Sequence, residues 1–449
     1  MDAPLQRRPR VALAAFGRAT FDLAAAGAVL ARSRAALAGL PLDVVAVSSL
    51  LTDPGAVTGF VRGLDADLLL CQFTTFVDGR FIVAAAEATA APLLLWSLRE
   101  PPRPGERLAL NSLTGANLAA RTLQGGGRFF RFVLGDPEEA PALGRVAALA
   151  RASAVRRLLA GFRVLVLGRA PDGFFFGDPN PAHCRALGVE VDGLDLDAVF
   201  RRAGELPEEV WRPVADAVRA RVTGLDRLPL DQVERFARAQ AVVEREVAAR
   251  GAAAVAVRCW PEFFTEFGAA ACSMVSALTD RGVPASCEAD ILGSVSMAVL
   301  QALAGGAPYL GDLASLDTGR NAAVFWHCGA GAFSLAAPRT GAVAGVHPNR
   351  GVGPTLEFAL RPGRVTLARF GETPGGLRLL AGAGEALDAP QPFLGTAATV
   401  RLDGAGSIEG RVRRLVEDGW EPHYALAYGD VGQELRDLAA LLGIPVCQM

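Results

Sequence analysis

Acidic residues at both ends of an apolar segment are the part of this sequence best suited to chemistry. Glu288 and Asp290 precede a run whose apolar residues recur at helical spacing, two glycines end it, and Asp312 follows. A carboxylate is costly beside so much apolar sequence unless it has a positive partner. We therefore interpret residues 284–317 as half of a metal site. The alternative is that Glu288 and Asp290 only begin the helix, where its dipole favours negative charge.

Glu262 and His423 could complete such a site. Glu262 follows an apolar segment that is typical of a strand, and His423 begins another, although a surface turn would also explain that histidine. His327 comes late in a strand and could support a ligand, contact a substrate or lie in the core. We interpret His183 and His347, which lie in loops of little character, as structural.

Three carboxylates and one imidazole form an oxygen-rich ligand set. This set suits Mn²⁺ or Mg²⁺ better than zinc, which favours more nitrogen or sulfur. Such a metal can bind two adjacent oxygens of a substrate and stabilise an enediolate, while a carboxylate carries a proton between carbons. Zinc hydrolysis is disfavoured because the chain has no HExxH-type pair of histidines.

Composition excludes several classes of function. The 449 residues predict two or three domains, and the net charge of −2 gives no support for a nucleic-acid surface. No apolar run approaches the ~20 residues that cross a membrane, and we see no clear signal peptide, so we expect a cytoplasmic protein. All 45 basic residues are arginine, which excludes enzymes that depend on a lysine, such as Schiff-base aldolases and pyridoxal-phosphate enzymes.

The 7 cysteines are scattered and include no CxxC pair. This spacing argues against a disulfide framework and against a structural zinc site. Cys259 and Cys287 lie beside candidate site residues. We interpret them as small core residues, with a catalytic thiol as the alternative.

Strand-like and helix-like segments alternate along residues 10–157 and again from residue 161. The predicted strands are continuously apolar, which indicates parallel sheets covered on both faces. After residue 336 short alternating runs predict a mostly antiparallel β domain, with a hairpin turn at 361–364, and the tail returns to strand, helix and strand. We predict domains at 1–157, 158–335 and 336–449, with the last strand–helix–strand returning to the central domain.

Polar residues follow the predicted strands of the first domain. In open α/β sheets ligands bind beyond the carboxyl ends of the strands, so these positions are candidate substrate contacts. Ordinary turn chemistry is the alternative for each of them. The candidates are Phe73, Thr74, Asn111 and Ser112.

Several motifs resemble the L-fucose isomerase and L-arabinose isomerase superfamily over nearly the whole chain. They are CWPEFF (259–264), CEADILGSVSMAVLQALAGGAPYLGDL (287–313), WHCGAG (326–331), GRVTLARFG (363–371) and EPHYALAYGD (421–430). FTTF and LALNSLTG in the first domain also fit this group.

The resemblance implies a role for each site residue. Glu288 and Asp312 would bind the metal and also form the acid/base pair, with His423 as the third ligand and Glu262 as an additional catalytic carboxylate. Asp290 would orient the start of the helix or support a ligand from behind. Trp260 and His327 would join the substrate contacts. The cofactor would be Mn²⁺, with Mg²⁺ or Co²⁺ as substitutes.

The resemblance also implies an architecture and an assembly. The fold would be α/β, with two doubly wound Rossmann-like domains followed by a β-rich, barrel-like C-terminal domain. Family members form trimers or hexamers whose active sites lie between subunits, so we expect a homo-oligomer without nucleic-acid or membrane partners.

We expect a metal-dependent aldose–ketose isomerase that acts on a hexose, deoxyhexose or pentose through a cis-enediol. The segment around Glu262 instead resembles fucose isomerase-like proteins, some of which act on sulfonated hexoses. An isomerase that converts sulfoquinovose to sulfofructose is therefore an alternative, and it would need an arginine such as Arg99, Arg121 or Arg258 for the sulfonate. A non-catalytic sugar-binding protein and a metal-dependent hydrolase or lyase are further alternatives.

Overall fold

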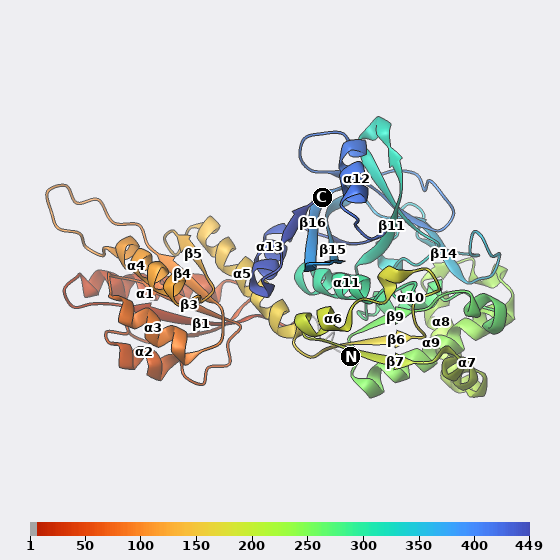
Figure 1. The fold of residues 1–449 in the computed structure, drawn as a ribbon, viewed down its shortest axis with the longest axis horizontal. Helices are drawn as coiled ribbons and strands as arrows, with labels where there is room; N and C mark the ends of the chain where they lie inside the picture. The colour runs from red at the N-terminus through yellow and green to blue at the C-terminus, as the bar shows by residue number, and fades with distance from the viewer. Residues whose placement is uncertain (1–6) are drawn as a thin grey trace. The chain divides into compact units, whose positions relative to one another are not determined.

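The computed structural model describes residues 7–449, which divide into two compact units (Figure 1). The first unit comprises residues 7–157 and 433–442. The second unit comprises residues 158–432 and 443–449.

The first unit is built on a five-stranded parallel sheet with strand order β2-β1-β3-β4-β5. Strands β3 and β4 are buried along their whole length, as their apolar sequences predict. The order is one of the two common doubly wound orders. The strands are β1 (Arg10–Phe16), β2 (Asp43–Ala46), β3 (Leu68–Phe73), β4 (Leu93–Ser97) and β5 (Phe130–Leu134). The helices between them are α1 (Leu23–Ala38), α2 (Pro54–Val61), α3 (Gly79–Ala88), α4 (Ser112–Gly125) and α5 (Ala140–Leu159).

Helix α13 (Gly432–Leu442) contributes to the first unit although it lies almost at the end of the chain. Its Asp437 is buried and accepts hydrogen bonds from Arg131 on β5 and Arg145 on α5. Its Glu434, also buried, pairs with Arg151. The carboxylates of α13 therefore neutralise these three arginines, which all belong to residues 7–157.

The second unit contains a four-stranded parallel sheet with strand order β10-β9-β6-β7. Its strands are β6 (Phe162–Leu167), β7 (Val189–Leu194), β9 (Ala254–Val257) and β10 (Ala285–Ser286). Its helices are α6 (Pro181–Leu187), α7 (Leu196–Glu205), α8 (Glu208–Arg219), α9 (Leu230–Arg250), α10 (Cys272–Asp280) and α11 (Ile291–Ala304). Helix α11 is buried on nearly every side, because it packs against β9 of this sheet and against β15 and β18 of the β-rich part.

The β-rich part contains a closed barrel. Hydrogen bonds run from β16 through β15, β18, β11, β12 and β17 and back to β16. These strands are β11 (Tyr309–Asp317), β12 (Ala322–His327), β15 (Gly363–Thr373), β16 (Gly376–Ala386), β17 (Thr396–Leu402) and β18 (His423–Tyr428). The predicted fold class, parallel α/β sheets with a barrel-like C-terminal part, is confirmed. Strands β11 and β12 join this barrel, although they precede residue 336, and the predicted domain boundaries stay a prediction.

The hairpin predicted at 361–364 is wrong. Strand β14 (Thr355–Ala359), which precedes this segment, pairs with β13 (Ala342–Gly345) and β17, not with β15. The hairpin lies one strand later, where Thr373 on β15 pairs with Gly376 on β16. The two residues between them, Pro374 and Gly375, form the turn, and both are common turn residues.

Within residues 7–449 no helix combines the length and the apolar character that a bilayer span requires.

Candidate active site

Three neighbouring strands of the barrel place candidate residues directly beside one another. Asp312 on β11 pairs directly with His423 on β18 and, on its other side, with Trp326 on β12. Directly paired residues point their side chains to the same face of a sheet. The pairing of β11 with β12 shifts register just after Asp312, between Leu313 and Ser315, an irregularity of the kind often found beside active sites.

Glu288 reaches the same place from a tight turn before α11. Glu288 and Ala289 both have left-handed backbone conformations, with φ of 56° and 53°. Such conformations are unfavourable for residues other than glycine and persist where the surroundings hold them. Here Ala289 donates its backbone N–H to Val257 O at the end of β9, 2.9 Å away. The turn thus aims the Glu288 side chain while the backbone stays tied to the parallel sheet.

His423 is the point on which the carboxylates converge. Its Nε2 lies 3.5 Å from Oε2 of Glu288 and 3.4 Å from Oδ1 of Asp312. This nitrogen is buried and has no hydrogen-bond partner among the described residues. Burial alone would lower the pKa of His423, but the hydrogen bond to Asp290 and the nearby carboxylates together raise it. Burial also raises the pKa of Glu288.

Asp290 supports His423 from behind. Its Oδ2 accepts from Nδ1 of His423 at 2.9 Å and from Nη1 of the fully buried Arg369 at 2.5 Å. Its Oδ1 accepts from Gly293 N and so caps α11. Burial would raise the pKa of Asp290, but the charge of Arg369 and the hydrogen bond from His423 lower it to about 2. Asp290 therefore begins α11, as expected, and also orients His423, whose role as a metal ligand stays a prediction.

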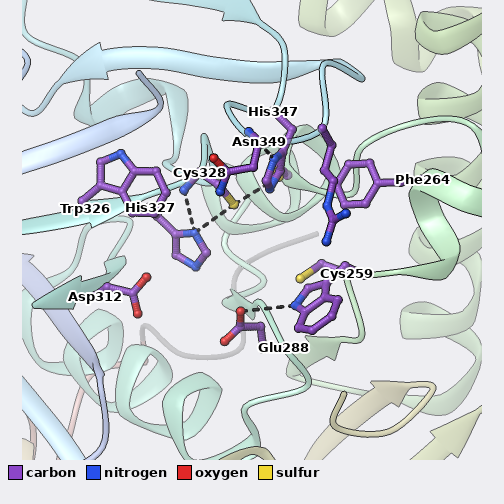
Figure 2. Close-up of a pocket in the computed structure, with 12 residues that line it drawn as sticks. Cys259, Phe264, Glu288, Asp312, Trp326, His327, Cys328, His347 and Asn349 are labelled. Atoms are coloured by element: carbon purple, nitrogen blue, oxygen red, sulfur yellow. Dashed lines mark hydrogen bonds between the residues drawn. The ribbon is translucent and has the colours of Figure 1, made fainter. Parts of the chain in front are cut away.

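Glu288 and Asp312 line a pocket with a cavity volume of about 190 Å³ (Figure 2). This volume is below the ~300–1,000 Å³ of sites for drug-sized ligands, so it suits a single sugar ring. The lining residues are Cys259, Trp260, Phe264, Cys272, Glu288, Asp312, Trp326, His327, Cys328, His347, Asn349 and Arg350.

Two predicted substrate contacts, Trp260 and His327, line this pocket. Trp260 places its indole Nε1 3.4 Å from Oε1 of Glu288. His327 accepts a hydrogen bond from Cys328 N at its Nδ1, so its Nε2 carries the proton. That Nε2 is buried and has no partner within the described part of the chain, which leaves one donor for a bound ligand.

The structure does not bring Glu262 to the pocket. Both of its carboxylate oxygens accept from Nε of Arg258, at 2.8 and 2.9 Å, and this pairing lowers the pKa of Glu262. Its catalytic role stays a prediction.

The four candidates of the first unit lie outside the unit that holds Glu288 and His423. Phe73 is buried, the hydroxyl of Thr74 donates to Phe16 O, and the hydroxyl of Ser112 donates to Phe73 O. Asn111 is partly exposed in a left-handed conformation at the start of α4. Their contact with a substrate also stays a prediction.

Sequence reasoning missed two segments of the site. Phe174 and Phe176, in the loop before α6, pack edge-on against Trp260 and His423 with ring centroids 5.2 and 5.1 Å apart. The signal was available as three consecutive phenylalanines in a loop rich in glycine and proline. The segment 347–350 also lines the pocket, although we interpreted His347 as structural.

Four of the cysteines gather around this pocket. The sulfur atoms of Cys272 and Cys328 lie 3.7 Å apart, and the thiol of Cys259 contributes to the raised pKa of Cys287. Thiol hydrogen bonds and burial raise the pKa of Cys287 and of Cys328. A thiol must ionise to act as a nucleophile, so these positions favour the core interpretation over a catalytic thiol.

Glu288, Asp312 and His423 fit a divalent cation by their chemistry. The hydrogen bond to Asp290 places the proton of His423 on Nδ1, so that Nε2 presents a lone pair toward two carboxylates. A set made only of acceptors, two acids and one imidazole, suits Mn²⁺ or Mg²⁺. Among residues 7–449 no group of three His, Cys, Asp or Glu side chains already stands in the geometry of a bound ion, so metal binding by this set stays a prediction.

Comparison with known proteins identifies relatives over almost the full chain. No family model matches it. It is 41% identical over 433 residues to a sulfoquinovose isomerase from Priestia aryabhattai. The matched region covers 95% of this chain and 96% of the relative. It is 42% identical over 404 residues to a sulfoquinovose isomerase from Alkalicoccus urumqiensis, covering 89% and 90%. A sulfoquinovose isomerase from Clostridium sp. (strain MSTE9) is 36% identical over 441 residues, covering 96% and 97%. The chain therefore belongs to the sulfoquinovose isomerase family, a fucose isomerase-like branch of the superfamily that its motifs resemble.

Proposed function

We propose that this aldose–ketose isomerase acts on a sulfonated sugar and converts sulfoquinovose to sulfofructose. Its relatives from three organisms, all sulfoquinovose isomerases, support this substrate. The observation that carries the chemistry is the convergence of Glu288 and Asp312 on the unpartnered Nε2 of His423 inside a sugar-sized pocket.

The two carboxylates move the protons. Aldose–ketose isomerisation takes a proton from C2, forms a cis-enediol, and returns a proton to C1. Glu288 suits this exchange because burial raises its pKa, which brings a carboxyl group closer to the pH at which it can both accept and release a proton. Asp312 faces the same space from the barrel and moves the proton between the two oxygens. His327, through its unpartnered Nε2, donates a hydrogen bond to the sugar.

We also propose that Glu288, Asp312 and His423 hold Mn²⁺, with Mg²⁺ or Co²⁺ as substitutes. The ion would supply Lewis-acid polarisation of the C1 and C2 oxygens. Asp290 fixes the imidazole in the orientation that this role requires, and Arg369 keeps Asp290 ionised.

A turnover assay on chelator-stripped protein, with and without added Mn²⁺, tests this proposal. The sugars are sulfoquinovose, L-fucose and D-arabinose. We expect ketose formation from sulfoquinovose that depends on Mn²⁺. Turnover of L-fucose or D-arabinose but not of sulfoquinovose would show that the protein acts on a different sugar. Turnover that is unaffected by stripping the metal would contradict the proposed cofactor.

Glu288→Gln and Asp312→Asn test the acid/base pair. Each keeps the shape of the side chain and removes its ability to exchange a proton, so we expect kcat to fall by at least about a thousandfold. Asp317→Asn, at the far end of the same strand as Asp312 and paired with Arg320, is the matched control and should retain activity. Activity close to wild type in both site variants would contradict the assignment.

A homo-oligomer, trimer or hexamer, and a cytoplasmic location are also part of the proposal. The resemblance to isomerases with shared active sites supports the oligomer, and the placement of Phe73, Thr74, Asn111 and Ser112 in a separate unit is compatible with it. Light scattering on the purified protein would measure the assembly, and a monomer at assay concentration would contradict it.

A further inference from the structure

The charges that line the pocket are divided between two groups of residues. Glu288 and Asp312 supply negative charge at the site of proton transfer. Among the described lining residues the single guanidinium belongs to Arg350, beside Asn349 and His347. Figure 2 shows His347 and Asn349 on the opposite side of the pocket from Asp312 and Glu288.

A sulfonated sugar carries its charge far from its reacting carbons. The sulfonate is attached to C6, whereas the proton moves between C1 and C2. A sulfonate is always ionised, so it is repelled by carboxylates and bound by a guanidinium, which presents several donors in a plane. A sugar whose C1 and C2 face Glu288 and Asp312 would therefore direct its sulfonate toward residues 347–350.

Building on the proposed function, we propose that Arg350, assisted by Asn349 and His347, binds the sulfonate and sets the specificity for sulfonated sugars. These residues lie in the connection between β13 and β14 of the second unit, the same unit as the acids.

The backbone of this connection is fixed by hydrogen bonds rather than left open. His347 N donates to Val352 O at 2.9 Å, and the N–H groups of Arg350 and Gly351 donate to His347 O at 3.1 and 2.9 Å. Gly353 N donates to Oε1 of Gln232 on α9. The ring of His347 packs edge-on against Phe264 with centroids 4.9 Å apart. A segment held in this way can present its side chains to a ligand with little loss of entropy.

Arg350 has its charge available for a ligand. Within residues 7–449 no carboxylate forms an ion pair with Arg350. The three arginines that the sequence suggests for the sulfonate are already paired or lie in the other unit. Arg258 pairs with Glu262 and donates to Ala170 O, and Arg99 pairs with Glu139. Arg121 lies on α4 of the first unit. None of these three lines the pocket.

His347 is suited to a neutral donor role beside Arg350. Burial, with a contribution from the charge of Arg350, lowers the pKa of His347 to about 4. Its Nδ1 accepts from Asn349 N at 3.3 Å, so the proton of the neutral ring is on Nε2. The segment thus offers a guanidinium, an imidazole N–H and an amide, all of which can donate to sulfonate oxygens.

The test compares wild type with Arg350→Met and Arg350→Lys at saturating Mn²⁺. Methionine keeps much of the length of the side chain without its charge. On sulfoquinovose we expect Arg350→Met to raise KM at least tenfold with kcat within about threefold, and Arg350→Lys to recover part of the loss. On 6-deoxy-D-glucose, which lacks only the sulfonate, we expect kcat/KM of Arg350→Met to stay within twofold of wild type. Arg413→Met, an exposed arginine on α12 (Ile408–Glu417) outside the pocket, is the matched control.

Mn²⁺ affinity and Tm show whether each variant keeps its fold and site, and calorimetric titration with sulfoquinovose measures binding without turnover. A wild-type KM in Arg350→Met, or an equal loss on both sugars, overturns the role of Arg350 alone. Wild-type protein that neither binds nor converts sulfoquinovose overturns the proposed substrate and this inference together. Loss of binding in Arg350→Met, with Mn²⁺ affinity intact, supports the inference even if turnover is slow.

Discussion

One oxygen atom of Asp290 has two charged or polar partners, Arg369 and His423, and its other oxygen caps α11. A buried carboxylate with a single charged partner would add little to the stability of the fold, because the cost of desolvation offsets the attraction. With all of its oxygens bonded, Asp290 instead fixes which nitrogen of His423 holds the proton. The same residue therefore links the start of a helix to the orientation of a proposed metal ligand.

His347 gives a prediction about stability against pH. Burial and Arg350 lower its pKa from the ordinary 6.5 to about 4 in the folded chain. The unfolded chain therefore binds more protons between pH 6.5 and 4, and the free energy of unfolding falls as the pH falls through this window. Since the ring is partly solvated, we expect a loss on the order of 2 kcal/mol.

The variant His347→Gln should lack this loss. Urea titrations of wild type and the variant at pH 7, 5.5 and 4 would measure it, and the difference between the two proteins removes the effects of other groups. If the difference in free energy of unfolding between wild type and His347→Gln is the same at all three pH values, the lowered pKa of His347 is ruled out.

At the scale of elements, the sequence predicts which segments are strands but not how they pair. The apolar runs identify β12 and β18, and the resemblance places Glu288, Asp312 and His423 in one site. The register that sets Asp312 beside His423 joins strands more than 100 residues apart and has no local signal. The left-handed turn at Glu288 and Ala289 is equally hidden, because both residues are atypical for it. Arg350 lies in a short polar connection that looks like any other loop until the fold places it on the pocket.

The end of β12 gives a prediction about backbone geometry. Gly329 has φ of 110°, and a Cβ there would lie 2.6 Å from Cβ of Thr355 and 2.7 Å from Leu356 N. We expect Gly329→Ala to lower the free energy of unfolding by about 3 kcal/mol and to reduce turnover, because it displaces the neighbouring Cys328 and His327.

Gly341→Ala is the matched control. Gly341 also has positive φ, 65°, but a Cβ there would meet nothing within 4 Å, so its cost should be only ~1 kcal/mol. Chemical denaturation and kcat of both variants would measure the difference. Equal losses would show that strain at φ, rather than the close approach to β14, dominates.

At the scale of the whole molecule, the first unit is completed by a helix from the far end of the chain. Asp437 of α13 is 1% exposed and pairs with Arg131 and Arg145, whose side chains are 36% and 21% exposed. We expect Asp437→Ala to lower the free energy of unfolding by about 2 kcal/mol, less than for a fully buried pair because the arginines regain some water. The first unit should lose stability more than the second.

Hydrogen exchange or limited proteolysis would locate that loss. Cleavage that becomes faster within residues 7–157, with the second unit still protected, is the expected result. Glu417→Ala, an exposed residue at the end of α12, should change neither. A uniform loss across both units would show that they unfold together.

The placement of α13 also ties folding to the timing of synthesis. A ribosome makes residues 7–157 first and residues 433–442 on the order of tens of seconds later, at ~5–20 residues per second. During that interval the arginines on β5 and α5 have no α13 carboxylates, and the part of the first unit's apolar core against which Leu441 will pack stays uncovered. The nascent first unit therefore stays incomplete, and accessible to chaperones and to other nascent chains, until residues 433–442 have been synthesised.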